Sequence, residues 1–315
     1  MPGPTVLESQ QGLNDQRIDL ITVVFRRELD LLRIQARSIE LYIPQQHIGK
    51  IFVVVNDDDY VDAFVDPAWW GSNRSRVVII NRARWTADTL QIDGWNSQQL
   101  YKLLAAEQAA STWSLCLDAK TWFVNPLKWE HLFTDTHKVR YNWFPVIPVF
   151  APAKETLEQI FNIAMPDVVG PGGVPFAFKT STVHAMIQWI EISQGKTFVE
   201  FFLENTQWPY HITEFMLYSA YVNKVHDCYS VLYDRHQYYT IINIAHNEAE
   251  QFAEKLAEMQ RPAALTASIH RNAYQHLTDE QITQWVEFLV YKQLITDPEN
   301  FKTAINTLRL QANNV

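Results

Sequence analysis

Residues 18 to 25 read IDLITVVF, a nearly continuous apolar run rich in β-branched side chains. A run of this composition is typical of a strand buried on both faces of a parallel sheet. Residues 28 to 42 follow it and carry apolar side chains at helical spacing, namely Leu29, Leu32, Ala36 and Ile39. The opening of the chain therefore predicts a strand followed by a helix.

The same alternation of strand and helix extends to Pro126. Further apolar runs predict buried strands at residues 51–55 (IFVVV), 77–80 (VVII) and 113–117 (WSLCL), and residues 98–110 predict a helix. This order predicts an α/β fold with a Rossmann-like, mostly parallel central sheet flanked by helices. Beyond Pro126 we expect an elaboration of that sheet, with a short strand at 174–179 and helices at 181–192, 213–222, 247–259 and 278–294.

The composition indicates a globular protein without a nucleic-acid partner. Hydrophobic residues make up 47% and charged residues 19% of the 315 residues, and the formal net charge is -9. This balance provides no general basic field for phosphate backbones. The two cysteines, Cys116 and Cys228, lack metal-type spacing and favour a reduced cytoplasm. No apolar stretch reaches the ~18–20 residues of a membrane span, so we expect a cytoplasmic protein whose membrane contact, if it has one, is peripheral at the inner membrane.

Polar residues follow each predicted strand of the first half, where ligands bind in open α/β sheets. They are Arg26 and Arg27, Asn56 and Asp57, Asn81 and Arg82, and Asp118 with Lys120. The set contains acceptors for hydroxyl groups and cations for a diphosphate, which are the groups that a nucleotide sugar requires. The alternative is that each of them is a solvated loop residue. The first of these turns, 25–28, contains no glycine, which argues against a dinucleotide-dependent oxidoreductase.

The segment SLCLDAKTWFVNP (114–126) resembles the signature of the GT-A nucleotide-diphospho-sugar transferases, a strand ending in Asp-x-Asp. In that family the acidic pair binds the ribose and a divalent cation that holds the diphosphate. Asp118 stands at the first acidic position, but Lys120 replaces the second carboxylate. An ammonium at this place can neutralise phosphates directly and make a metal dispensable. The competing interpretation is that Lys120 faces solvent while Asp118 and His270 hold Mn²⁺ or Mg²⁺.

The order of the surrounding motifs resembles a little-characterised bacterial branch of glycosyltransferase-like proteins, over roughly residues 18–294. The motifs are GWNSQQLYKL (94–103), LDAK (117–120), VPF (174–176), TEFMLY (213–218) and SIHR (268–271). The resemblance implies that Gln98, Gln99 and Lys102 line the donor side. On a helix Gln98 and Lys102 share a face whereas Gln99 points elsewhere, so one glutamine has a structural role in this interpretation. Lys102 is then a phosphate or sugar contact, with a surface role as the alternative.

Glu214 is the predicted catalytic base, since an inverting transferase needs a carboxylate that takes the proton of the acceptor hydroxyl. Its aromatic neighbours Trp208, Tyr210 and Phe215 favour a partly buried group with raised proton affinity. The alternative is a carboxylate that merely stabilises the first turn of a helix. His211 is a weaker candidate for the base.

Two further segments complete the predicted site. The resemblance implies that His270 and Arg271 contact the diphosphate, and the alternative for His270 is a structural role. The segment from Gly170 to Gly173 is either a mobile lid over the site or an ordinary connection.

The resemblance implies a GT-A fold with one catalytic domain over 16–295, preceded by a tail over 1–15 and followed by a C-terminal helix over 296–315. Within the domain, 16–126 is the nucleotide-binding half and 127–295 the acceptor half. The implied function is transfer of a sugar from a nucleotide-diphosphate donor to a glycan or lipid-linked glycan, in surface polysaccharide or lipopolysaccharide synthesis. The alternative is a catalytically inactive nucleotide-sugar- or carbohydrate-binding protein.

Overall fold

The computed structural model describes ten segments of the chain, separated by short gaps. They are residues 16–57, 61–86, 94–141, 144–166, 168–169, 174–206, 212–226, 228–237, 239–245 and 248–312. The predicted tail over 1–15 and the glycine segment 170–173 lie outside the described residues, as do Trp208, Tyr210 and His211. The predictions made for them remain predictions.

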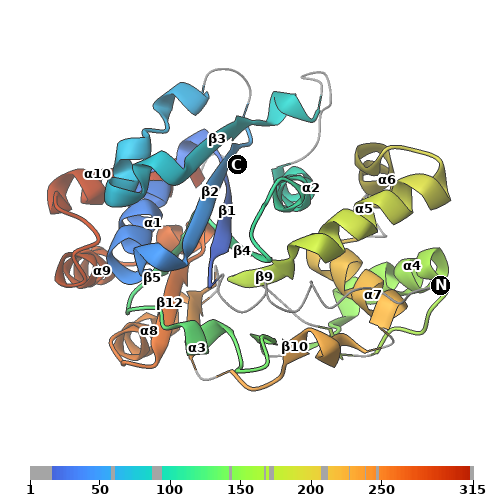
Figure 1. Cartoon of the computed structure of the whole chain (residues 1–315). Helices are drawn as coiled ribbons and strands as arrows, with labels where there is room; N and C mark the ends of the chain where they lie inside the picture. The colour runs from blue at the N-terminus through green and yellow to red at the C-terminus, as the bar shows by residue number, and fades with distance from the viewer. Residues whose placement is uncertain are drawn as a thin grey trace.

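A five-stranded sheet forms the centre of the molecule (Figure 1). Its order is β3-β2-β1-β4-β9, with β1 at Ile18–Val24, β2 at Ile48–Val55, β3 at Val77–Asn81, β4 at Trp113–Asp118 and β9 at Phe176–Lys179. The first four strands pair in parallel, and β9 pairs antiparallel with β4. Every residue of β1 is buried, as a strand covered on both faces requires. The predicted α/β fold with a mostly parallel central sheet is therefore confirmed.

Helices cover both faces of this sheet. The helix α1 (Leu29–Tyr42) follows the short 3-10 turn η1 (Arg26–Glu28) and lies on one face, whereas α2 (Gly94–Glu107) lies on the other. The remaining helices of that second side are α4 (Ala151–Phe161), α5 (Thr180–Gln194), α6 (Phe198–Asn205) and α7 (Glu214–His226). Contacts of α2 with α5, α6 and α7 join this group to the sheet.

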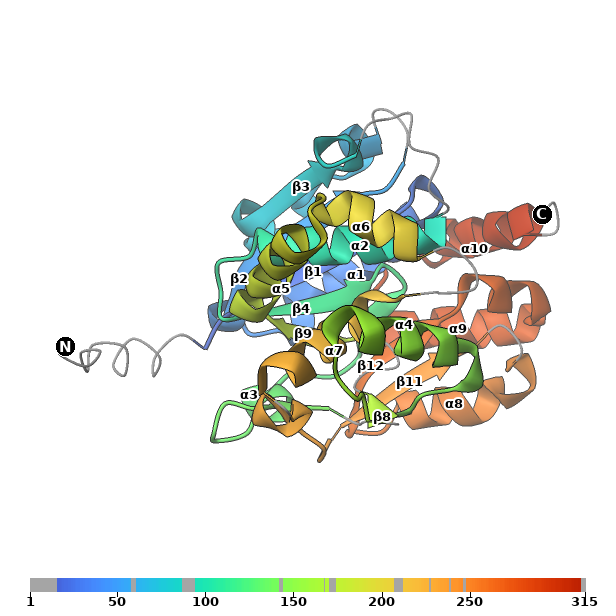
Figure 2. The same ribbon diagram turned by 90° about the vertical axis from the view of Figure 1, so that its right-hand side faces the viewer.

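A second sheet, which the sequence analysis does not predict, has the order β11-β12-β5. It consists of β5 (Thr121–Phe123), β11 (Thr240–Ile244) and β12 (Ala264–Ile269). Since β5 comes directly after β4 and pairs antiparallel with β12, the two predicted halves of the domain share this sheet. Figure 2 shows β11 and β12 close to the helices that pack on them.

Three helices near the C-terminus bury the second hydrophobic core against this sheet. They are α8 (Phe252–Met259), α9 (Asp279–Tyr291) and α10 (Pro298–Ala312). The predicted capping box before α9 is present: Gln281 N donates to Thr278 Oγ1 at 3.1 Å, and Thr278 N donates to Gln281 Oε1 at 2.8 Å. The helix α10 lies within the predicted C-terminal segment 296–315 and packs against α9.

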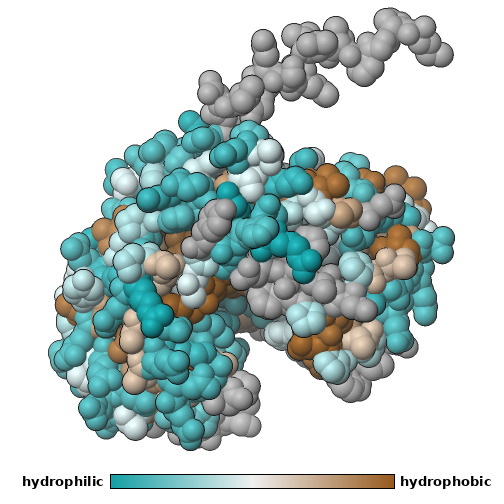
Figure 3. Space-filling model, turned by 90° about the horizontal axis from the view of Figure 1, so that it is seen from below, coloured by the Kyte–Doolittle hydropathy of each residue, from teal (hydrophilic) through white to brown (hydrophobic). Residues whose placement is uncertain are grey.

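Short elements connect these layers. They are α3 (Trp129–Leu132), β6 (Val139–Arg140) paired with β10 (Tyr233–Asp234), and β7 (Phe144–Pro145) paired with β8 (Val168–Val169). The surface is hollowed between the lobe that carries α8 and α9 and the lobe that carries α4, α5 and α7 (Figure 3). Among the helices that the structure describes, none is long and apolar enough to cross a membrane.

Candidate functional site

Three charged side chains from different elements meet where β4 ends. Asp118 is the last residue of β4, Lys102 lies in α2, and Glu214 is the first residue of α7. Lys102 Nζ lies 2.9 Å from Asp118 Oδ1 and 3.0 Å from Glu214 Oε1. The Lys102 and Glu214 side chains are 6% and 4% exposed. The structure therefore brings together three of the predicted site residues in a nearly buried cluster, and the surface role considered for Lys102 is wrong.

Helix α2 positions this cluster through a second contact. Glu214 N donates to Gln99 Oε1 at 3.3 Å, so the first turn of α7 is bound by both Gln99 and Lys102. The expectation that Gln99 points away from Lys102 is wrong, because residues three apart on a helix are also neighbours. Gln99 is the structural glutamine of the pair, and it is almost completely buried.

The protonation of the cluster follows from burial and from the close charges. Burial disfavours a charged Lys102, but the carboxylates of Asp118 and Glu214 outweigh it and hold the pKa of Lys102 well above its usual value. Burial also acts against the charge of Asp118, yet Lys102 and Lys120 hold the pKa of Asp118 well below its usual value. For Glu214 burial dominates over Lys102, so the pKa of Glu214 is raised. At neutral pH Lys102 and Asp118 are consequently both charged.

Lys120 binds the other oxygen of the same carboxylate. Its Nζ lies 3.2 Å from Asp118 Oδ2, and its side chain is 24% exposed. Gln35 fixes the main chain here, since its Nε2 donates to the carbonyl oxygen of Asp118 at 2.6 Å and to that of Thr121 at 3.0 Å. Asp118 is thus shared between a buried ammonium and one that reaches the surface, and Lys120 does not simply face solvent.

This arrangement does not suit a divalent cation at Asp118. Both carboxylate oxygens already bind ammonium groups, which repel a metal ion. His270, the other metal ligand considered, is the N-cap of the 3-10 helix η9 (Arg271–His276), and Asn272 N lies 3.2 Å from its Nδ1. Within the described segments, no group of three or more His, Cys, Asp or Glu side chains is placed to hold a metal ion.

Glu28, the last residue of η1, is a further charged residue at this edge of the sheet. Burial raises the pKa of Glu28, Asp118 adds to that rise, and Lys120, Arg271 and Arg27 oppose it. The Glu28 carboxylate therefore lies within electrostatic reach of both Asp118 and Lys120. Glu28 is not predicted as a site residue because it fits the helical pattern of residues 28–42, although it stands only two residues after Arg26 in the same strand-end turn.

Arg271 joins this group. Burial lowers the pKa of Arg271, Arg27 acts in the same direction, and Glu28 opposes both. Arg27 and Arg271 therefore lie near each other. The carboxyl ends of β1 and β4 and the start of η9 together gather Lys120, Arg27 and Arg271 around Glu28.

Two predicted residues, Arg26 and Asp57, line a cavity of about 620 Å³. Arg26 N donates a hydrogen bond to Asp57 Oδ2 and so joins the ends of β1 and β2. The other described residues of the lining include Arg27, Asp30 and Gly94, and α10 contributes Ala304, Thr307 and Leu308. Asp118 and Lys120 are not among the described lining residues. Of the predicted donor residues, Arg26 and Asp57 therefore line the cavity, whereas Lys102, Asp118 and Lys120 form the charged cluster. Arg27 lines the cavity as well and acts electrostatically on Glu28 and Arg271.

The fold places the chain in the class of proteins with a GT-A-like glycosyltransferase fold. It is similar to the structure of WbbM, a bifunctional glycosyltransferase, with a TM-score of 0.53, 12% identity, and coverage of 95% of this chain and 52% of that one. The chain thus spans about half the length of WbbM. It also matches two structures of LgtC with TM-scores of 0.44, each covering 91% of this chain and 100% of that one. One is a galactosyltransferase in complex with donor and acceptor sugar analogues at 15% identity, and the other is an active-site mutant of the same protein at 14%.

The family of the chain is defined by its sequence. Residues 20–265 match the model of a family of unknown function, DUF6492, and the chain belongs to this family. No curated protein matches the sequence.

Proposed function

We propose that this protein is a glycosyltransferase that moves a sugar from a nucleotide-diphosphate donor to an acceptor hydroxyl. The observation that carries the proposal is the pair of ammonium groups, Lys102 and Lys120, bound to Asp118 at the end of β4 in a GT-A-like fold. In open α/β sheets this edge is where ligands bind. The cavity lined by Arg26 and Asp57, which follow β1 and β2, would supply the space for a nucleoside.

The cations at this edge suit the diphosphate of such a donor. Lys120, Arg27 and Arg271 lie around the carboxyl ends of β1 and β4, and charge-assisted hydrogen bonds from them would meet the phosphate oxygens. The same groups would stabilise the charge that develops on the leaving nucleoside diphosphate. Lys102 has a different role from these cations, because it is buried and keeps the carboxylate of Asp118 ionised and in place.

The transfer that we propose is inverting. A carboxylate takes the proton of the acceptor hydroxyl, whose oxygen forms a bond to the anomeric carbon as the bond to the diphosphate breaks. The nucleoside diphosphate leaves with that electron pair. Glu214 is our proposed base, supported by its raised pKa beside Lys102. Glu28 is the second candidate, since burial also raises its pKa and it neighbours Lys120.

We further propose that the reaction needs no Mn²⁺ or Mg²⁺, because ammonium groups bind both oxygens of Asp118. The expected acceptor is a glycan or lipid-linked glycan in surface polysaccharide or lipopolysaccharide synthesis, in the cytoplasm or peripherally at the inner membrane. That part of the proposal rests on the resemblance of the motif order.

A panel of nucleotide sugars tests the proposal in two steps. The true donor should raise the unfolding temperature, since a ligand at 100 times its Kd stabilises the native state by ~2.7 kcal/mol. The same donor should then release its nucleotide in the presence of the protein. Stabilisation without release would support the inactive binding protein, and the absence of any stabilising nucleotide sugar would refute the proposal.

A further inference from the structure

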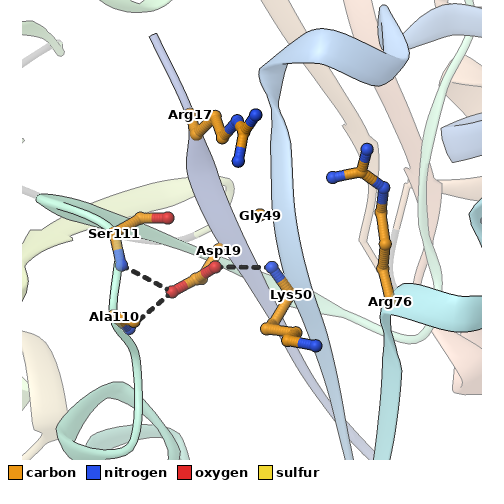
Figure 4. A pocket seen from close by; sticks show the side chains of 7 residues that line it. All are labelled: Arg17, Asp19, Gly49, Lys50, Arg76, Ala110 and Ser111. Carbon is orange, nitrogen blue, oxygen red and sulfur yellow. Dashed lines mark hydrogen bonds between the residues drawn. The ribbon is translucent and has the colours of Figure 1, made fainter. Parts of the chain in front are cut away.

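A second cavity, of about 320 Å³, lies at the opposite edge of the central sheet, where its parallel strands begin (Figure 4). Arg17 directly precedes β1 and Arg76 directly precedes β3. Asp19 lies at the start of β1, and Gly49 and Lys50 lie at the start of β2. None of the residues that line this cavity belongs to the proposed transferase site. This cavity is therefore a separate candidate binding site.

The carboxylate of Asp19 is held by the main chain. Asp19 is 1% exposed, and its Oδ1 accepts a hydrogen bond from Lys50 N at 2.5 Å. Its Oδ2 accepts from Ala110 N at 2.8 Å and from Ser111 N at 2.9 Å. Three main-chain donors thus fix this carboxylate as part of the wall, joining β1 to β2 and to the segment before β4.

Gly49 allows this close packing. A Cβ at Gly49 would lie 2.1 Å from Asp19 Oδ1 and 2.6 Å from Ser111 Oγ, so that no side chain fits there. The main chain of β2 can therefore approach Asp19 directly, and no side chain of residue 49 occupies the cavity.

Among the cavity-lining residues that the structure describes, cations outnumber this carboxylate. Three cationic side chains, Arg17, Lys50 and Arg76, line it in a chain whose formal net charge is -9. Arg76 is anchored, because its Nη1 donates a hydrogen bond to the carbonyl oxygen of Ile48. A guanidinium carries five N–H donors, so Arg76 keeps donors for a ligand. Figure 4 shows Arg17 on the β1 side and Arg76 on the β3 side of Gly49 and Lys50.

We propose that this cavity binds a phosphate group, held between Arg17 and Arg76, either as inorganic phosphate or as the phosphomonoester of a sugar. Planar guanidinium groups match the oxygens of such an anion with paired hydrogen bonds, and Lys50 adds positive potential. The proposal is independent of the transferase activity, because the two sites lie at opposite edges of the sheet.

The test is a calorimetric titration of the full chain with inorganic phosphate and with glucose 1-phosphate at low ionic strength. We expect saturable binding of at least one of them, weakened at least about tenfold in Arg76→Gln and in Arg17→Gln, as the loss of a charged hydrogen bond predicts. The matched control is Arg84→Gln, which removes an exposed arginine that binds Gln108 and should leave the affinity unchanged. Tighter binding of the ester would identify a sugar phosphate, and equal binding would identify phosphate alone.

Two results would overturn the proposal. One is the absence of saturable binding of both probes at millimolar concentration. The other is binding that Lys120→Gln abolishes while Arg76→Gln and Arg17→Gln retain it, since the phosphate would then sit at the carboxyl edge of the sheet. If Arg76→Gln fails to fold because its bond to Ile48 is lost, Arg17→Gln decides alone. The first result does not bear on whether nucleotide sugars bind, whereas the second would place the phosphate at the cations of the proposed donor site.

Discussion

The two edges of the central sheet hold their buried carboxylates in different ways. At the carboxyl edge Asp118 and Glu214 are bound by the ammonium of Lys102, so the charges compensate one another inside the protein. At the amino edge Asp19 is bound by three main-chain N–H groups, beside a cavity lined by three cationic side chains. Because Lys102, Asp118 and Glu214 bind one another through their side chains, the loss of one leaves the charges of the others uncompensated. The three main-chain bonds of Asp19 involve no cationic side chain.

The largest expected effect concerns the base at the carboxyl edge. We expect Glu214→Gln to lower the rate of nucleotide release from the donor by ~10²–10⁴-fold, the usual contribution of a general base. The matched variant is Glu28→Gln, which removes the second candidate base, a carboxylate whose pKa burial also raises. Both rates should be measured on protein whose folding is verified by its unfolding transition. If Glu28→Gln abolishes release and Glu214→Gln retains it, Glu28 is the base and Glu214 only binds Lys102.

The next effect concerns the stability of the same cluster. Lys102→Met leaves two carboxylates without their buried cation, and breaking a buried ion pair in this way typically costs ~3–5 kcal/mol. Lys120→Met also removes one ammonium from Asp118, but from a more exposed position, so we expect a loss of ~1 kcal/mol or less. Urea unfolding of both variants measures the difference. Equal losses would show that Lys102 is not the structural cation of the cluster.

A smaller loss is expected at the amino edge. Asp19→Asn replaces one carboxylate oxygen by an NH₂ group, which faces main-chain N–H donors and leaves at least one of them unsatisfied. We expect a loss of ~1–3 kcal/mol in urea unfolding. Lys50→Gln serves as the control, since the bond to Asp19 comes from the main chain of Lys50 and stays. A large destabilisation by Lys50→Gln would mean that its side chain, and not its N–H, holds the carboxylate.

The strands of the fold differ in how well the sequence predicts them. The strands β1 to β4 are predictable because continuous β-branched runs mark a doubly covered sheet. The strand β11 is not, since its five residues run from exposed Thr240 to buried Ile244 without a clear pattern, and the three residues of β5 are too few for one. Local patterns therefore carry no such signal for β5 and β11.

The residues of the candidate site are likewise only partly predictable from the sequence. Asp118 ends a predicted strand and Lys120 follows two residues later, so both are predictable from that position alone. The pairing of Lys102 with Glu214 joins residues 112 positions apart, and only tertiary packing brings them together. The role of Asp19 is not predictable for a related reason. Asp19 lies inside an apolar run that predicts a strand, and the three N–H groups that bind it come from two other segments.

The smallest expected effect is that of a chelator. With Lys102 and Lys120 on both oxygens of Asp118, donor binding and nucleotide release should change less than about twofold in EDTA, because ammonium groups carry the charge that a cation would otherwise supply. The comparison variant is Lys120→Asp, which rebuilds Asp-x-Asp and replaces the cation with a second carboxylate. We expect it to lose donor binding in EDTA and to regain part of it with Mn²⁺, since paired carboxylates attract a divalent ion that then meets the diphosphate. Complete loss of the unmodified protein's activity in EDTA, restored by Mn²⁺, would show that a metal displaces Lys120 from Asp118 during the reaction.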